Sequence, residues 1–259
     1  APLYGAHVMT HTDHAARKLL PWIDGLLDAG EEYYRQHGKP LFSSHMIDLS
    51  EEPLEQNIET CKRYLERMTR IGMTLEIELG ITGGEEDGVD NTDVDSSRLY
   101  TQPEEVAYAY EELSKVSDKF TVAAAFGNVH GVYKPGNVKL RPQVLKEGQA
   151  AVAKELGSEA ENWLVFHGGS GSELSDIHET LGYGVVKMNV DTDTQYAYTR
   201  PVVDHIFKHY DEVIKVEGEV GNKKQYDPRT WMKKGENAMT ERIAQACRDL
   251  KSDGKSINL

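Results

Sequence analysis

The sequence is poor in cysteine, in long apolar runs and in positive charge. Cys61 and Cys247 are the only cysteines among its 259 residues, too few for the disulfide framework of a secreted scaffold and badly placed for a cysteine-rich zinc site. No apolar run approaches the roughly 20 residues of a membrane-spanning helix, and the N-terminal residues lack the pattern of a signal peptide. These absences favour a cytoplasmic protein with no membrane partner.

Negative charge outweighs positive charge along the chain. Forty-three acidic and 29 basic residues give a formal net charge of -14, which would repel nucleic acid and anionic membrane surfaces. We therefore expect no nucleic-acid partner. An anionic small substrate stays open, because a bound cation and backbone amides can reverse the potential inside one pocket.

Short β-rich runs alternate with longer segments of helical period, which is typical of an α/β protein built on a parallel sheet. The pattern predicts six strands, at His7–His11, Leu41–Ile47, Thr74–Leu79, Phe120–Phe126, Trp163–Phe166 and Val185–Val190. It predicts helices at Leu54–Arg70, Pro103–Lys115, Pro142–Leu156, Thr194–His209 and Met239–Leu250.

Six strands suggest most of a TIM (β/α)8 barrel that lacks its first two strands. Such a barrel needs eight parallel strands to close, so the missing pair would precede Ala1. We expect residues 1–259 to form a single domain that is incomplete at its N-terminal end. An open doubly wound sheet is the competing architecture.

Polar residues gather just after the predicted strands, where the loops of a barrel form its functional face. Asp13 and His14 follow the first strand, and Glu76 and Glu78 lie inside the apolar third strand. Residues two apart share one face of a strand. If that face lines the barrel, the carboxylates need a cation or strong hydrogen bonds; a solvent-facing edge is the alternative.

Three histidines are candidates for one metal centre. His14 lies beside a carboxylate, and His130 and His167 lie at strand ends beside glycines. A catalytic zinc takes about three protein ligands, and wide spacing in sequence is harmless when all three lie on one barrel face. We interpret six further histidines as structural: His7, His11, His37, His178, His205 and His209. His45 is intermediate between a structural and a functional histidine.

Two loops have compositions that suit a ligand site. Residues 82–88 place three acids between glycines, as in a mobile loop carrying an acid or base or in a plain acidic turn. Residues 168–172 are rich in glycine and serine and precede a short helix, an arrangement that can bind phosphate. Asn189 and the threonines that follow it could complete a phosphate site or orient a hydroxyl.

Six motifs in order resemble those of the class II fructose-bisphosphate aldolases, along essentially the whole chain. They cover residues 12–14, 42–50, 83–88, 126–131, 167–172 and 226–229. The resemblance implies a cytoplasmic homodimer of TIM barrels. It also implies reversible cleavage of fructose 1,6-bisphosphate to dihydroxyacetone phosphate and glyceraldehyde 3-phosphate, in glycolysis and gluconeogenesis.

The resemblance also implies a role for each matching residue. His14, His130 and His167 would hold a zinc ion that polarises the ketone and stabilises the enediolate. Glu86 would move the proton at the nucleophilic carbon of dihydroxyacetone phosphate, and Asp13 the proton on the aldehyde-derived hydroxyl.

Further matches concern orientation, phosphate and a second zinc position. Asn189 would orient the enediolate, Arg229 would reach a substrate phosphate across the dimer, and Asp48 and Glu78 would form an alternative inward zinc position. Five residues match family positions near the phosphate and a monovalent cation, Na+ or K+: Gly131, Gly168, Ser170, Asp191 and Thr192.

The sequence departs from the family pattern in three places. It lacks the two upstream strands, Ala15 replaces a frequent cysteine, and the connection at residues 221–224 is short. Two other functions therefore stay open. The chain could be an inactive zinc-binding fragment or pseudoenzyme, or an aldolase for another sugar bisphosphate such as tagatose bisphosphate.

Overall fold

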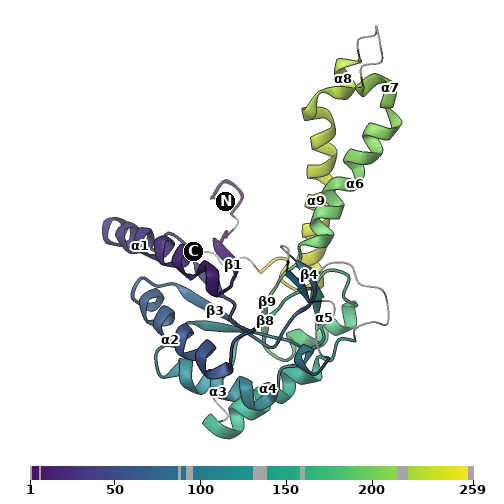
Figure 1. Ribbon diagram of the computed structural model, residues 1–259. Helices are drawn as coiled ribbons and strands as arrows, with labels where there is room; N and C mark the ends of the chain where they lie inside the picture. Colours follow the sequence, from purple (N-terminus) through teal and green to yellow (C-terminus); the bar gives the residue numbers. More distant parts are fainter. Residues whose placement is uncertain are drawn as a thin grey trace.

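The main sheet is a partial barrel of parallel strands joined by helices (Figure 1). The computed structural model describes residues 2–5, 7–86, 89–91, 96–130, 139–157, 161–214 and 221–255. In the described residues this sheet has the order β1-β2-β3-β6-β8-β9. The strands are β1 (His11–Ala15), β2 (Ser44–Ile47), β3 (Thr74–Leu79), β6 (Phe120–Ala124), β8 (Leu164–Phe166) and β9 (Val185–Met188).

A second sheet of three described strands is formed by segments that lie between strands of the main sheet in the sequence. Its strands are β4 (Gly83–Glu86), β5 (Val89–Asn91) and β7 (Val129–His130). β4 pairs antiparallel with β5 and parallel with β7, so that Gly84 lies opposite His130. This pairing brings the acidic segment at residues 82–88 beside the segment that carries His130.

Helices connect the strands and cover the outer face of the main sheet (Figure 1). Short 3-10 turns accompany them in the part of the chain that the structure describes: η1 (Pro2–Tyr4), η2 (Arg17–Leu19) and η3 (Ser96–Leu99). The helices are α1 (Leu20–His37), α2 (Leu54–Arg70), α3 (Pro103–Ser114), α4 (Gln143–Leu156), α5 (Leu174–Leu181), α6 (Thr192–Lys208), α7 (Tyr210–Val213), α8 (Lys223–Tyr226) and α9 (Pro228–Asp249). Among these described helices, none has both the length and the apolar composition needed to cross a membrane.

The hydrophobic core decides which face of β3 carries its carboxylates. Leu75, Ile77 and Leu79 are fully buried in the core between the sheet and its covering helices. Each large apolar side chain removed from water contributes roughly 1.5–3 kcal/mol. Because side chains alternate along a strand, Glu76 and Glu78 must face the opposite way, into the barrel.

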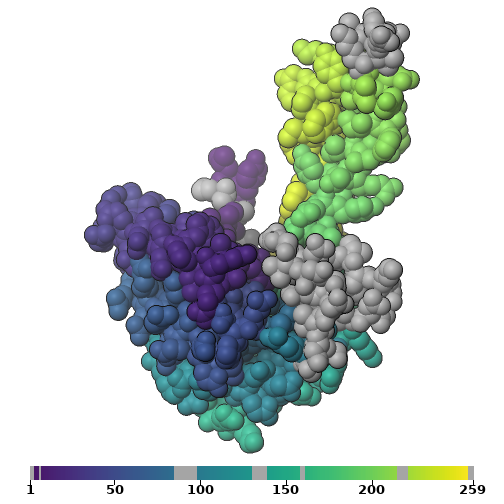
Figure 2. Space-filling view, viewed as in Figure 1, coloured from purple at the N-terminus to yellow at the C-terminus, as the bar shows by residue number. Residues whose placement is uncertain are grey.

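α6 and α9 pack along each other and form an arm that extends away from the barrel (Figure 1). The space-filling view shows this arm standing clear of the body of the molecule (Figure 2). Gly235 allows the two helices to approach closely, because a Cβ at this position would lie 2.9 Å from the ring of Tyr198. The far end of the arm holds α7 and α8.

Several predicted bounds are wrong. The first strand begins at His11, not His7, and the apolar Val8 and Met9 are exposed at 71% and 75%. The last helix begins at Pro228, where Asp227 caps it, eleven residues before the predicted start at Met239. The sequence pattern also does not predict α1, whose buried stripe is only Ile23, Leu27 and Gly30.

Candidate metal centre and substrate site

A bulge in β1 turns Asp13 and His14 toward the same point. Thr12 pairs with His45 and Ala15 with Ile47, so β1 holds one residue more than β2 over this stretch. His14 has a φ of 40°, in the left-handed region that a non-glycine residue seldom adopts. Bulges re-aim side chains beside functional sites, and this one lets two neighbouring polar residues share a site.

The Nδ1 atom of His14 faces two carboxylates. It lies 2.9 Å from Oδ2 of Asp48 and 3.3 Å from Oε2 of Glu78. Burial lowers the pKa of His14, but the hydrogen bonds to Asp48 and Glu78 and the nearby negative charges outweigh burial and raise it to about 11. The pocket around this ring therefore favours a positive charge.

The Nε2 atom of His14 faces His167 on the other side. It lies 3.0 Å from Nδ1 of His167, whose own Nε2 donates to Oε1 of Glu76 at 2.8 Å. A carboxylate only accepts, so Glu76 fixes the proton of His167 on Nε2 and Asp48 fixes that of His14 on Nδ1. Without a cation, the proton that the raised pKa keeps on Nε2 of His14 is shared in the 3.0 Å hydrogen bond to Nδ1 of His167, and a metal ion between the two nitrogens would replace that proton.

A divalent cation fits between these groups. Ligand atoms of Asp13, His14 and His167 all lie within 4.8 Å of one another. Two nitrogens bound to a tetrahedral zinc at about 2.0–2.1 Å lie roughly 3.3 Å apart, close to the observed 3.0 Å. Oε2 of Glu78 is buried and lies 3.3 Å from Nδ1 of His14 and 3.8 Å from Nδ1 of His167, so a further oxygen ligand lies beside this position.

Asp13 and Asn189 lie together at the edge of this cluster. Nδ2 of Asn189 is 3.4 Å from Oδ2 of Asp13, whose side chain is 49% exposed. Burial opposes ionisation of Asp13, but the hydrogen bond from His11 and the charges of nearby rings and Lys187 hold its pKa well below the ordinary value. Asp13 is therefore a carboxylate able to accept a proton from a bound molecule.

The loop after β8 and the start of α6 form a compact polar cradle. The φ of Gly168 is +60°, and a Cβ there would lie 2.2 Å from the carbonyl oxygen of Val129, so this position needs glycine. Oγ of Ser170 accepts from the amide of Asp193 at 3.2 Å. Asp191 is the residue before α6 and Thr192 its first residue. Amides and hydroxyls at a helix N-terminus suit an anion.

Two hydrogen bonds to the side chain of Asp193 stabilise this cradle. Oδ2 of Asp193 accepts from the amide of Gly171 at 3.3 Å and from Nη2 of Arg242 at 2.8 Å. Nη1 of Arg242 and Oγ of Ser172 are buried and have no partner among the described residues. Arg242 lies on α9, so the arm and the cradle are directly connected.

The structure does not bring every predicted site residue to this cluster. Arg229 is the second residue of α9, its side chain is 85% exposed, and Asp227 holds its guanidinium. α9 begins next to α8 at the far end of the arm (Figure 1), so its second residue, Arg229, lies away from its own barrel. The side chains of His130 and Glu86 and all of Gly131 lie outside the described residues.

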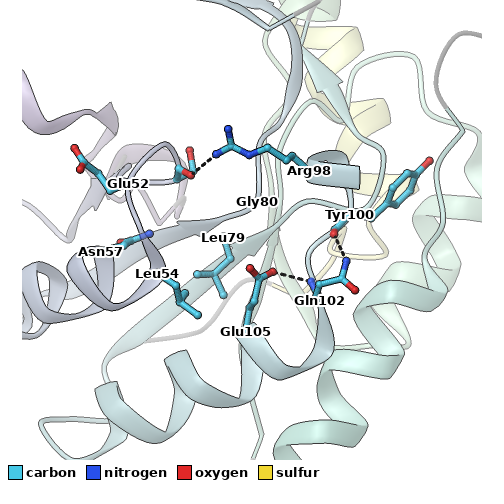
Figure 3. Close-up of a pocket in the computed structure, with 10 residues that line it drawn as sticks. Glu52, Leu54, Asn57, Leu79, Gly80, Arg98, Tyr100, Gln102 and Glu105 are labelled. Atoms are coloured by element: carbon cyan, nitrogen blue, oxygen red, sulfur yellow. Dashed lines mark hydrogen bonds between the residues drawn. The ribbon is translucent and has the colours of Figure 1, made fainter. Parts of the chain in front are cut away.

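A separate pocket of about 180 Å3 lies between the end of β3 and the starts of α2 and α3 (Figure 3). Its polar groups bond one another: Arg98 donates to the carbonyl of Ser50 at 3.4 Å, and Glu105 accepts from the amide of Gln102 at 2.8 Å. Because its wall is internally paired, the histidine cluster is the better candidate for chemistry.

A family model for class II fructose-bisphosphate aldolases matches residues 3–255 of the chain. The chain belongs to the class II fructose-bisphosphate aldolases. This family membership confirms the resemblance drawn from the motifs and makes the chain a lyase of the divalent-metal type.

Individual relatives agree with this family. The chain is 58% identical over 256 residues to a fructose-bisphosphate aldolase of Haemophilus influenzae, covering 95% of this chain and 70% of the relative. It is 58% identical over 257 residues to a class 2 aldolase of Escherichia coli. A crystal structure of the Campylobacter jejuni aldolase matches with a TM-score of 0.83 and 53% identity, over 97% of this chain and 73% of that one. The barrel fold is thereby confirmed.

Sequence reasoning missed part of this aldolase site. Lys187 on β9 donates to both oxygens of Glu76, at 3.1 and 2.9 Å, and lies 3.4 Å from Nε2 of His11. His11, interpreted as structural, also bonds Oγ of Ser44 at 2.8 Å. The available signal was the alternation itself, since His11 and Asp13, like Glu76 and Glu78, are two residues apart.

Proposed function

We propose that the full-length protein catalyses the reversible aldol cleavage of fructose 1,6-bisphosphate to dihydroxyacetone phosphate and glyceraldehyde 3-phosphate, in glycolysis and gluconeogenesis. The observation that carries this proposal is the convergence of His14, His167 and Asp13 beside a phosphate-type cradle. Family membership supplies the reaction class.

Three histidines would hold the metal, which we propose is zinc. His14 and His167 offer the two facing nitrogens, and His130 is the third candidate. When bound, zinc supplies a Lewis acid that polarises the ketone carbonyl of the substrate. Asp48 and Glu78 offer the oxygens of an alternative inward position, since they flank His14 on its other side.

Two carboxylates would move the protons. In cleavage, Asp13 takes the proton of the C4 hydroxyl while the C3–C4 bond breaks and its electron pair stays on C3. Glu86 then delivers a proton to C3, which completes dihydroxyacetone phosphate. Because its pKa is held low, Asp13 is ionised before the step and has the free carboxylate oxygen that takes this proton. Asn189, next to Asp13, would orient the reacting oxygens.

Phosphate binding would use the cradle at residues 168–172 and the start of α6. Gly168 lets the backbone approach closely, and Ser170, Asp191 and Thr192 surround the same helix N-terminus. We propose that Gly131 and a monovalent cation, Na+ or K+, complete this phosphate site, because the carboxylate of Asp191 would otherwise repel a dianion.

We infer that the active form is a cytoplasmic homodimer. Arg229 precedes Arg242, the residue of α9 that contacts the cradle, by 13 residues, which is about 20 Å along the helix at 1.5 Å per residue. Arg229 therefore cannot reach the cradle of its own chain. The arm also exposes large apolar side chains that a second copy would cover: Tyr196, Phe207, Tyr210 and Ile243. A partner's arm would then bring its Arg229 to this chain's phosphate.

The decisive experiment combines metal analysis with a cleavage assay on the full-length protein. We expect about one zinc per chain, triose phosphate release from fructose 1,6-bisphosphate, and loss of activity on chelation that added zinc restores. Preferred cleavage of tagatose bisphosphate would assign another sugar. Zinc without cleavage of either sugar would indicate an inactive zinc-binding protein instead.

A further inference from the structure

Glu76 is the most deeply buried carboxylate in the site that no proposed chemical step uses. Its side chain is only 2% exposed, and it receives hydrogen bonds from two other strands. His167, directly after β8, donates to it at 2.8 Å, and Lys187 of β9 donates to both of its oxygens. An unpaired buried carboxylate is very costly, so one partner must supply a positive charge.

Lys187 is that partner. Its ammonium is the single permanently charged cation among the described groups that contact Glu76, because His167 acts as a neutral ligand when it binds a metal through Nδ1. Two bonds from one ammonium to both carboxylate oxygens also fix the rotation of the carboxylate. Glu76 is thereby aimed at the Nε2–H of His167, and Nδ1 of His167 is left to face His14.

The ammonium also occupies a position that a second cation could take. Ligand atoms of His11, Asp13 and Glu76 lie within 4.8 Å of one another, as in a metal cluster. Nζ of Lys187 already lies 2.9 Å from Oε2 of Glu76 and 3.4 Å from Nε2 of His11. The resident lysine thus supplies the positive charge here, and the metal is directed to the neighbouring His14–His167 position.

We propose that Lys187 is a positioning residue for the metal centre: its ammonium bonds both oxygens of Glu76 and holds that carboxylate aimed at His167, which leaves His167 oriented to bind zinc through Nδ1. This inference deepens the proposed function and rests on it for the identity of the metal. It assigns no contact of Lys187 with substrate.

Zinc affinity of the full-length protein, measured by competition with a chromophoric chelator, tests this role. Lys187→Met should weaken zinc binding about 10- to 100-fold, the usual cost of losing an outer partner of a metal ligand, and Lys187→Arg should restore most of it. The direction is informative, because a lysine that merely repelled zinc would give tighter binding when removed.

A double-mutant comparison isolates the pair. Glutamine at position 76 keeps an acceptor for His167 but has no charge to neutralise, so Lys187→Met in the Glu76→Gln background should change zinc affinity less than about threefold. Nitrogen NMR of the zinc-free protein should show the Nε2–H form of His167 in the native protein and Lys187→Arg, and its loss in Lys187→Met. Lys62→Met is the matched control, because it breaks a lysine–glutamate pair of 2.7 Å elsewhere on the molecule.

Each possible outcome of these measurements either supports or overturns the role of Lys187. Unchanged or tighter zinc binding in Lys187→Met, or an equal loss in the Glu76→Gln background, would overturn the inference even if the native protein cleaves fructose 1,6-bisphosphate. The expected pattern in a protein that cleaves no sugar bisphosphate would instead uphold the role of Lys187 and refute the proposed function.

Discussion

Substituting Gly168 tests whether the cradle and the metal centre depend on one close backbone contact. An alanine Cβ at this position would lie 2.2 Å from the carbonyl oxygen and 2.7 Å from the carbonyl carbon of Val129, although real Cβ contacts are essentially never under 3.0 Å. The loop must therefore move by at least about 0.8 Å, the difference between 3.0 and 2.2 Å. Val129 precedes His130 and Gly168 follows His167, so the movement separates two proposed zinc ligands.

The expected cost has two parts. A non-glycine residue in the left-handed region costs roughly 1–2 kcal/mol, and overpacking adds about 1–3 kcal/mol. We expect Gly168→Ala to lower the free energy of unfolding by about 2–5 kcal/mol. Because a 1 Å misplacement can cost about 100-fold in rate, kcat/KM for fructose 1,6-bisphosphate should fall by a similar factor, with weaker zinc binding.

Gly171→Ala is the matched control within the same loop. Its φ is +75°, but a Cβ there meets nothing within 4 Å. It should therefore show only the conformational cost of about 1–2 kcal/mol. Denaturant melts, chelator competition and steady-state kinetics on both full-length variants provide the comparison. Equal losses of zinc affinity and kcat/KM in the two variants would refute the reasoning, because backbone strain alone would then explain both.

Three further predictions address the chemistry, the dimer and the cradle. Glu86→Gln should keep zinc but lose about 10²–10⁴-fold in the rate of proton exchange on dihydroxyacetone phosphate. His14→Ala should instead lose zinc binding, proton exchange and cleavage together. An unaltered exchange rate in Glu86→Gln would exclude Glu86 as the base. Mixing inactive His14→Ala and Arg229→Ala dimers should restore about a quarter of native activity. Half of the dimers are then mixed, and in each of them one of the two sites combines a native His14 with a native Arg229 from the other chain. No gain in activity would contradict a role for Arg229 across the dimer. Arg242→Met should raise the KM for phosphorylated substrate about tenfold at unchanged zinc content, since Asp193 loses a charged hydrogen bond; an unchanged KM would separate the arm from phosphate binding.

The periodicity of the sequence predicts the sheet well where strands are apolar and buried on one face. β3 has the predicted bounds, and the predicted sharing of one face by Glu76 and Glu78 is correct; the burial of Leu75, Ile77 and Leu79 in the core then decides that this face is the inner one. The first strand is misplaced because its residues, His-Thr-Asp-His-Ala, have little strand propensity, and pairing with β2 decides its position. Tertiary pairing overrides local pattern there.

Helix bounds fail where glycines interrupt the helical pattern of the sequence. Gly25 and Gly30 weaken the local helical signal of α1, yet the helix packs on the core through Ile23 and Leu27, and a Cβ at Gly30 would make only an ordinary 3.7 Å contact with Ile71. Gly235 similarly hides the first half of α9, because its contact with Tyr198 is invisible in the sequence. Contacts between distant segments decide both cases.

The composition of the site explains why residues found one at a time from sequence act together. Asp13, Asp48, Glu76 and Glu78 bring four carboxylates within reach of His14, His167 and Lys187. Lys187 offsets one of these charges, and a divalent cation would offset two of the remaining three. The negative charge of the one remaining carboxylate costs least free energy where water solvates it, and Asp13 is the half-exposed member of the group. With Lys187 and a divalent cation compensating the other three, Asp13 would be the carboxylate of these four left to take the proton that the proposed cleavage assigns to it.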